Sequence, residues 1–170
     1  MTEASHVGDL VTRLALSHPE VSFRFINNGQ VKLHTSGNGN LKDVIYHIYG
    51  REIASNLIEV DFERKGIHIT GYLGKPLISR GNRNFENYFV DGRYIKSSII
   101  SKAIEDGYKD FTMQHKYPFV VLYLDVDTEH VDVNVHPTKM DVRFNNQQEI
   151  YNTLFAAVDD GLHERELIPE

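Results

Sequence analysis

VDVNVHPTKMDVRF, residues 131–144, is the run that says most about the architecture of this chain. Valine occupies every second position in its first part, and apolar residues alternate again from Met140 to Phe144. Alternation with a period of two predicts a pair of half-buried strands. The connecting HPTK contains Pro137, which interrupts strand pairing, and Lys139, which carries a positive charge at the turn. A cation held in this way predicts contact with an anion, although an ordinary surface lysine is the alternative.

The segments around this pair predict a mixed α+β fold. Residues 119–126 (FVVLYLDV) are apolar enough for a central strand, and residues 149–162 have the spacing of an amphipathic helix. Strands and helices do not alternate regularly, which favours an open mixed sheet with helices on one face. The other predicted elements are helices at residues 5–17, 41–49 and 97–113, and strands at residues 21–26, 31–35, 57–63, 67–73 and 85–90.

The composition narrows the class of protein. Of the 170 residues, 41% are hydrophobic and 25% are charged, as in globular proteins. No run approaches the roughly 18 apolar residues of a membrane span, and the first ten residues lack a signal-peptide pattern. We therefore expect a cytoplasmic protein with no membrane partner. The chain has no cysteine, and its nine histidines lack zinc-site spacing, so no metal site is predicted.

Charge is distributed unevenly along the chain. The net charge of −6 argues against extensive contact with nucleic acid. Residues 80–116, however, contain seven basic and five acidic residues, which permits a local basic face. Within this region FVDGRYIKSS, residues 89–98, places Arg93 and Lys96 just before a predicted helix. Cations and free backbone N–H groups at a helix start can bind phosphate, although Arg93 paired with a carboxylate is the alternative.

Two other groups of residues resemble binding sites but have simpler explanations. The glycine-rich residues 36–39 lead into a helix, where phosphates bind, but the segment is short and is typical of a linker. Asp125, Asp127 and Asp132 lie near a strand end and resemble metal ligands, yet acids are common in turns.

Three segments carry a resemblance to a known family: FVDGRYI (residues 89–95), YPFVVLYLDVD (residues 117–127) and VDVNVHPTKMDVRF. In order and spacing they resemble the transducer domain of the MutL family of DNA mismatch repair proteins. The resemblance covers roughly residues 50–158. HVGDLVTRLALSHPEVSFRFINNGQVKL, residues 6–33, resembles the last helix and strand pair of the preceding ATPase domain. The resemblance implies three parts: the end of an ATPase domain (1–37), a transducer domain (38–162) and a tail (163–170).

The resemblance also implies roles for particular residues. MutL proteins are GHKL ATPases, and the motifs of the ATP-binding core are absent here, so we expect this piece to bind no cofactor and to catalyse nothing alone. ATP and Mg²⁺ would belong to the intact protein. Lys139 would act catalytically by reaching the γ-phosphate of ATP in the neighbouring domain, and Thr138 would belong to the same nucleotide-binding turn. Arg93 and Lys96 would bind DNA. Asp91, commonly Asn in the family, places an acid beside that site.

The implied function is DNA mismatch repair, with this region coupling ATP binding and hydrolysis to dimer closure and DNA binding. The implied partners are the protein's own ATPase domain, a second MutL subunit, MutS and DNA, with a nucleoid-associated location. The alternatives are a stand-alone nucleic-acid-binding module and the transducer of another GHKL protein such as a type II topoisomerase. The implied fold resembles domain 2 of a ribosomal protein and contains a left-handed βαβ crossover, whereas strand physics alone predicts the right hand.

Overall fold

The computed structural model describes residues 3–127, 131–132, 143–144 and 147–167. The chain divides into two compact units, unit 1 (Met1–Asn56) and unit 2 (Leu57–Glu170), and each is described by itself. The domain limits implied by the resemblance stay predictions.

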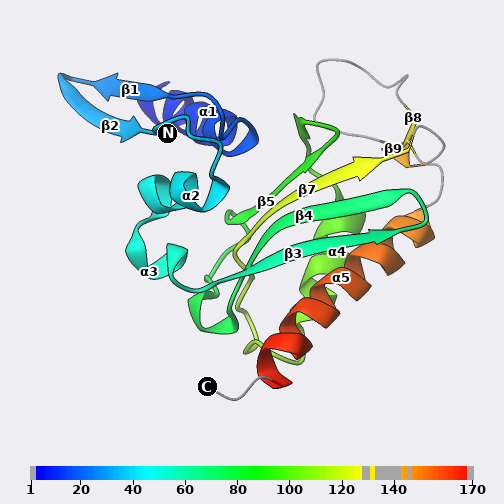
Figure 1. Ribbon diagram of the computed structural model, residues 1–170. Helices are drawn as coiled ribbons and strands as arrows, with labels where there is room; N and C mark the ends of the chain where they lie inside the picture. Colours follow the sequence, from blue (N-terminus) through cyan, green and yellow to red (C-terminus); the bar gives the residue numbers. More distant parts are fainter. Residues whose placement is uncertain (1–2, 128–130, 133–142, 145–146, 168–170) are drawn as a thin grey trace. The chain divides into compact units, whose positions relative to one another are not determined.

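Unit 1 is an αββ segment followed by two helices (Figure 1). Its elements are α1 (Glu3–Ser17), β1 (Arg24–Asn27), β2 (Gln30–His34), α2 (Leu41–Tyr49) and α3 (Arg51–Ala54). The turn between β1 and β2 is formed by Asn28 and Gly29, which both have positive φ and suit a tight hairpin. Helix α3 was not predicted, because it has only four residues and follows Gly50 directly.

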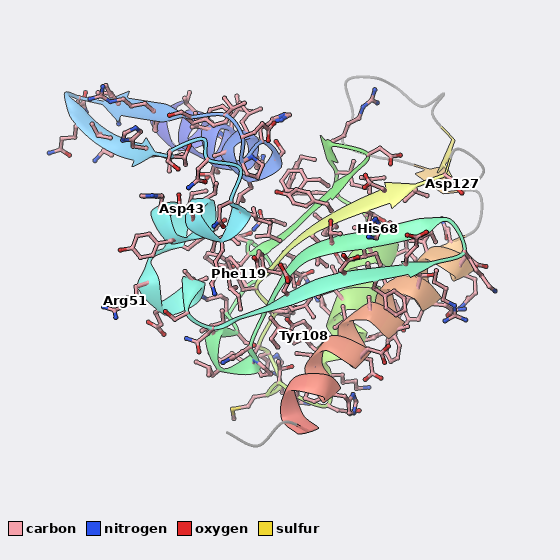
Figure 2. All side chains as sticks on the ribbon, viewed as in Figure 1. Asp43, Arg51, His68, Tyr108, Phe119 and Asp127 are labelled. Atoms are coloured by element: carbon pink, nitrogen blue, oxygen red, sulfur yellow. The ribbon has the colours of Figure 1, made fainter. Side chains whose placement is uncertain are left out.

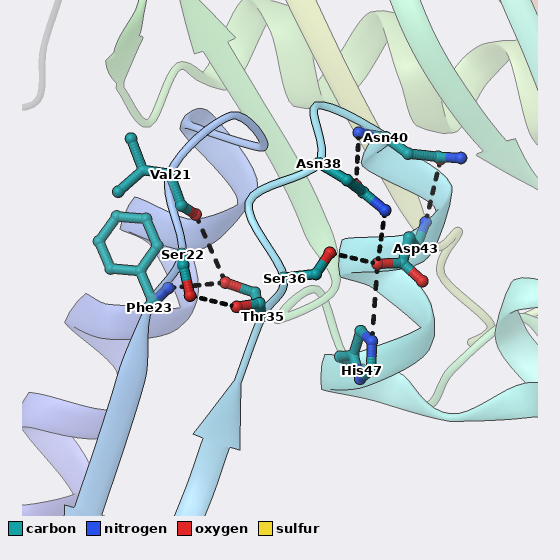
Figure 3. A network of polar contacts seen from close by, with 9 residues as sticks. All are labelled: Val21, Ser22, Phe23, Thr35, Ser36, Asn38, Asn40, Asp43 and His47. Atoms are coloured by element: carbon teal, nitrogen blue, oxygen red, sulfur yellow. Dashed lines mark hydrogen bonds and ion pairs between the residues drawn. The ribbon is translucent and has the colours of Figure 1, made fainter.

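Side-chain hydrogen bonds hold the connection between β2 and α2 (Figure 3). Asp43 accepts hydrogen bonds from Ser36 Oγ at 3.0 Å and Asn38 Nδ2 at 3.4 Å, and its own backbone N–H donates to the capping residue Asn40. Gly37 has φ +74°, and a Cβ there would lie 2.7 Å from the backbone nitrogen of Ser22. Residues 36–39 are therefore a structured connection inside unit 1.

Unit 2 is built on a five-stranded mixed sheet (Figure 1). Its elements are β3 (Leu57–Arg64), β4 (Ile67–Gly74), the 3-10 helix η1 (Pro76–Ile78), β5 (Glu86–Val90), β6 (Arg93–Tyr94), α4 (Ser98–Tyr108), β7 (Val120–Val126), β8 (Val131–Asp132), β9 (Arg143–Phe144) and α5 (Gln147–Leu167). The strand order is β3-β4-β7-β5-β6. Strand β7 is antiparallel to β4 and parallel to β5. The predicted mixed α+β fold is confirmed.

Helices α4 and α5 pack on one face of this sheet, and the core lies between the two layers (Figure 1). Alternate residues of β4 and β7, such as Ile69 and Leu124, are buried there with Ile104 of α4 and Leu154 of α5. Tyr108, labelled in Figure 2, is fully buried, and its hydroxyl donates to the carbonyl of Gly74 at 2.6 Å. Burial of this apolar surface is the main source of stability.

Helices α4 and α5 differ most from their predicted limits. Helix α4 ends at Tyr108 rather than near residue 113. The backbone N–H of Lys109 donates to the Asp106 carbonyl and that of Phe111 to the Tyr108 carbonyl, three residues back in each case, so the α-helical i−4 pattern is interrupted there. Helix α5 is longer than predicted and spans Gln147–Leu167. Strands β5 and β7 are parallel neighbours connected through α4, as a βαβ crossover requires. The hand of this crossover stays a prediction.

The base of the pair predicted at residues 131–144 is present. Val131 pairs with Phe144 and Asp132 with Arg143 in antiparallel register. Residues 133–142, with Thr138 and Lys139, lie outside the described residues.

Candidate nucleic-acid interface

Arg93 and Lys96 follow the tight turn between β5 and β6 and precede α4. Arg93 is the first residue of β6, directly after Asp91 and Gly92. Both cationic side chains are exposed. Among the residues that the structure describes, no carboxylate oxygen lies within 4.0 Å of either cation. The alternative in which Arg93 pairs with a carboxylate thus finds no partner in the described part of the chain.

The start of α4 is fixed to the neighbouring strand. Ser97 caps the helix, its Oγ accepting a hydrogen bond from the backbone N–H of Ile100 at 3.3 Å. The hydroxyl of Tyr88, on β5, lies 2.9 Å from the nitrogen and 3.0 Å from the oxygen of Ser97. It also lies 2.8 Å from Ser101 Oγ. The short segment that carries Arg93 and Lys96 is therefore held at its α4 end.

Asp91 has a structural role that the sequence interpretation missed. Its Oδ1 accepts a hydrogen bond from the backbone N–H of Val126 at 2.9 Å, and its own N–H donates to the Leu124 carbonyl at 2.9 Å. The sequence interpretation placed Asp91 in a turn and considered its charge, which opposes phosphate, but not these contacts with β7. An asparagine, which the resemblance implies for this position, offers the same acceptor oxygen.

Two other bases of residues 80–116 are paired with carboxylates. Arg83 donates to both carboxylate oxygens of Glu105, at 2.9 and 3.2 Å, and its guanidinium lies 4.4 Å from the ring centroid of Tyr117. Lys102 lies 2.8 Å from Asp106 on the same helix. Lys102 is therefore a surface cation paired within α4, whereas Arg93 and Lys96 are cations exposed beside the start of α4.

A buried carboxyl, that of Glu86, lies near Arg83 and Glu105. Glu86 of β5 is only 7% exposed, and neither of its oxygens accepts a hydrogen bond from any residue in the described part of the chain. Burial, and then the neighbouring carboxyl of Glu105, raise the pKa of Glu86 to about 9. The raised pKa favours the neutral form of this side chain, whose charged neighbours are Glu105 and Arg83.

The acids considered as metal ligands do not form such a site within the described residues. Across residues 3–127 and the short described segments beyond them, no group of three or more His, Asp or Glu side chains could hold a metal ion. The backbone N–H of Asp127 donates to the Gly66 carbonyl at 3.1 Å, a contact between strand ends. No described helix is long and apolar enough to cross a membrane.

The comparisons with known proteins agree with this architecture. Residues 45–163 match the family described as DNA mismatch repair protein, C-terminal domain. The chain belongs to this family. It is 59% identical over 169 residues to the DNA mismatch repair protein MutL of Agathobacter rectalis, covering 99% of this chain and 26% of that protein. It is 44% identical over 160 residues to MutL of Clostridium acetobutylicum, covering 94% of this chain and 26% of that protein. The chain thus spans about a quarter of the length of these relatives.

Two solved structures share the fold. The N-terminal domain of a DNA repair protein superposes with a TM-score of 0.79 at 21% identity, covering 96% of this chain and 54% of that one. The Aquifex aeolicus MutL ATPase domain complexed with ADP gives a TM-score of 0.52 at 17% identity, covering 88% of this chain and 46% of that one. At this identity the likeness concerns the fold alone.

Proposed function

We propose that this chain is the transducer region of a MutL-type mismatch repair protein. It couples ATP binding and hydrolysis in an adjacent GHKL ATPase domain to dimer closure and to DNA binding. The observation that carries the proposal is the pair of exposed cations, Arg93 and Lys96, beside the capped start of α4 in a chain of this family. Phosphate groups are bound by cations together with the free N–H groups of a helix start.

The apolar surface of unit 1 supports an adjacent ATPase domain as the partner. On α1, Val7 is 44% exposed, Leu10 is 55% exposed and Leu14 is 39% exposed. On the β1–β2 hairpin, Ile26 and Val31 are each about half exposed. Contiguous exposed apolar side chains mark an interaction surface. In the intact protein, this surface packs against the rest of the ATPase domain.

Lys139 and Thr138 contribute to the nucleotide site of that domain in this proposal. A compact ammonium beside the γ-phosphate stabilises the charge that develops during phosphoryl transfer. Its contact depends on the γ-phosphate, so Lys139 also reports the nucleotide state. The 170-residue chain alone neither binds nor hydrolyses ATP. A second subunit and MutS are the further partners of the intact protein.

A charge reversal tests the DNA contact. In the intact protein, Arg93→Glu should weaken binding to duplex DNA, because phosphate contacts release counterions, and should lower the slope of log affinity against log salt by about one. Lys109→Glu is the matched control, since Lys109 is an exposed cation just beyond the other end of α4. The control should keep both the affinity and the slope.

Equal affinity and slope for the Arg93→Glu variant and the wild type would remove Arg93 from the interface. Tight DNA binding by the 170-residue chain alone at physiological salt would instead favour the stand-alone nucleic-acid-binding module.

A further inference from the structure

Strand β7 ends between two tight turns that belong to its neighbours in the sheet. On the β4 side is the turn of Lys65 and Gly66, and on the β5 side is the turn of Asp91 and Gly92. All four residues have positive φ. The backbone N–H of Asp127, labelled in Figure 2 at the end of β7, donates to the Gly66 carbonyl at 3.1 Å. The end of β7 is therefore held from both sides.

Asp91 makes the contact on the β5 side with two hydrogen bonds. Its backbone N–H donates to the Leu124 carbonyl, and its Oδ1 accepts from the Val126 N–H, each at 2.9 Å. Asp91 has φ +48°, a conformation that aspartate and asparagine adopt more readily than most residues. The position thus requires both a positive φ and a short side chain that ends in an acceptor.

Arg93 lies two residues after Asp91, in a strand of only two residues. Arg93 pairs with Val90 and Tyr94 pairs with Phe89, so the hairpin is held to β5 by these two positions. The two hydrogen bonds of Asp91 add a direct link from the turn to β7. A displacement of the turn would break this link at Val126, the last residue of β7.

We propose that Asp91 is a positioning residue that links the DNA-contacting hairpin to the end of β7 and so transmits DNA binding to ATP turnover. The proposal rests on the proposed function above. In the sequence, Lys139 follows β7 by thirteen residues, so the end of β7 lies on the chain between the two contacts that must be coupled. A residue that joins the hairpin to this strand affects both sites without touching DNA or nucleotide.

Two substitutions of Asp91 separate this role from a general structural one. Asp91→Gly keeps the backbone conformation, because glycine adopts positive φ freely, but removes the acceptor for the Val126 N–H. Asp91→Asn keeps both the conformation and the acceptor oxygen, so it is the matched control. Thermal unfolding of each variant establishes that unit 2 is folded before the readouts are compared.

The experiment measures the DNA stimulation of the intact protein, which is its ATP turnover with saturating duplex DNA divided by its ATP turnover without DNA. The wild type and Asp91→Asn should show the same stimulation, and Asp91→Gly should lose it. Hydrogen exchange of the Val126 amide should be about tenfold faster in Asp91→Gly only, because that N–H loses its acceptor.

Full stimulation of Asp91→Gly would overturn this inference and leave the proposed function intact, provided that Arg93→Glu abolishes stimulation. A wild-type protein whose ATP turnover does not respond to DNA, or an Arg93→Glu variant with normal stimulation, would overturn the proposed function and this inference together.

Discussion

The two units of this chain bury their apolar side chains to different extents. In unit 2, a continuous cluster of buried side chains joins the sheet to α4 and α5. In unit 1, α1 and the β1–β2 hairpin leave much apolar surface exposed. Within the described residues, seven of the nine exposed large hydrophobic side chains belong to unit 1. Unit 1 does bury a few side chains, such as Leu16, Val44 and Ile45. Its exposed apolar face, in contrast with unit 2, suits contact with a neighbouring domain.

Breaking the sheet of unit 2 should have the largest effect. A Cβ at Gly71 would collide with the backbone carbonyl oxygen of Val121 on the paired strand, and Gly71 has φ +127°. Gly71→Ala should therefore cost more than about 4 kcal/mol. Urea unfolding should show that unit 2 no longer folds cooperatively.

Gly81→Ala is the control for this variant, because nothing lies within 4 Å of a Cβ at that glycine. The account of the β4–β7 pairing fails if Gly71→Ala unfolds at the same urea concentration as this control.

The buried Glu86 should make unit 2 less stable as the pH rises. The native state keeps the Glu86 proton up to a pKa of about 9, whereas the unfolded chain releases it near pH 4.5. Between these values the unfolded state gains stability with rising pH, because it binds fewer protons than the native state. Below the lower value the effect disappears.

Glu86→Gln should remove this dependence, since glutamine is neutral and has nearly the same shape. At pH 8 the variant should be about 1 to 3 kcal/mol more stable than the wild type, and at pH 4 the difference should be close to zero. Thermal unfolding across this range measures the effect. A stability difference that does not change with pH would show that Glu86 is already ionised in the native state.

A substitution on the apolar face of α1 should have different effects on stability in the 170-residue chain and in the intact protein. In the 170-residue chain, Leu10 is 55% exposed, so Leu10→Ser should change the free energy of unfolding by less than about 0.5 kcal/mol. In the intact protein, where the proposed ATPase domain would cover the helix, the same substitution should cost about 1 to 2 kcal/mol. Chemical unfolding of both proteins gives the two values.

Equal costs in both contexts would mean that α1 remains exposed in the intact protein. Unit 1 would then not be part of a larger domain.

Local patterns predicted most of the secondary structure. Helix α2 begins and ends at the predicted residues, and the β3–β4 hairpin turns between the two predicted strands, at Lys65 and Gly66. Both depend on periodicity and turn residues within a few positions. Helix α3 and strand β6 were not predicted, because elements of four and two residues carry no measurable period.

The contacts that matter most at the candidate site are not local. Asp91 bonds to Val126, 35 positions away, and no pattern around either residue indicates this contact. The burial of Glu86 depends on α4 packing over β5, although an acid on a strand is ordinarily exposed. The sequence predicted Arg93 and Lys96 as candidates through their place before a helix, and the structure shows both exposed at its capped start.

The central claim is that this region couples nucleotide state to DNA binding, and Lys139 is where the two should meet. Coupling between sites is reciprocal in binding free energy. The most direct measurement is the DNA affinity of the intact protein with and without a non-hydrolysable ATP analogue. In the wild type the analogue should change the affinity by about fivefold or more. In Lys139→Ala, with the analogue at a saturating concentration, the ratio of the DNA affinities with and without the analogue should approach one. An unchanged ratio in this variant would contradict the account.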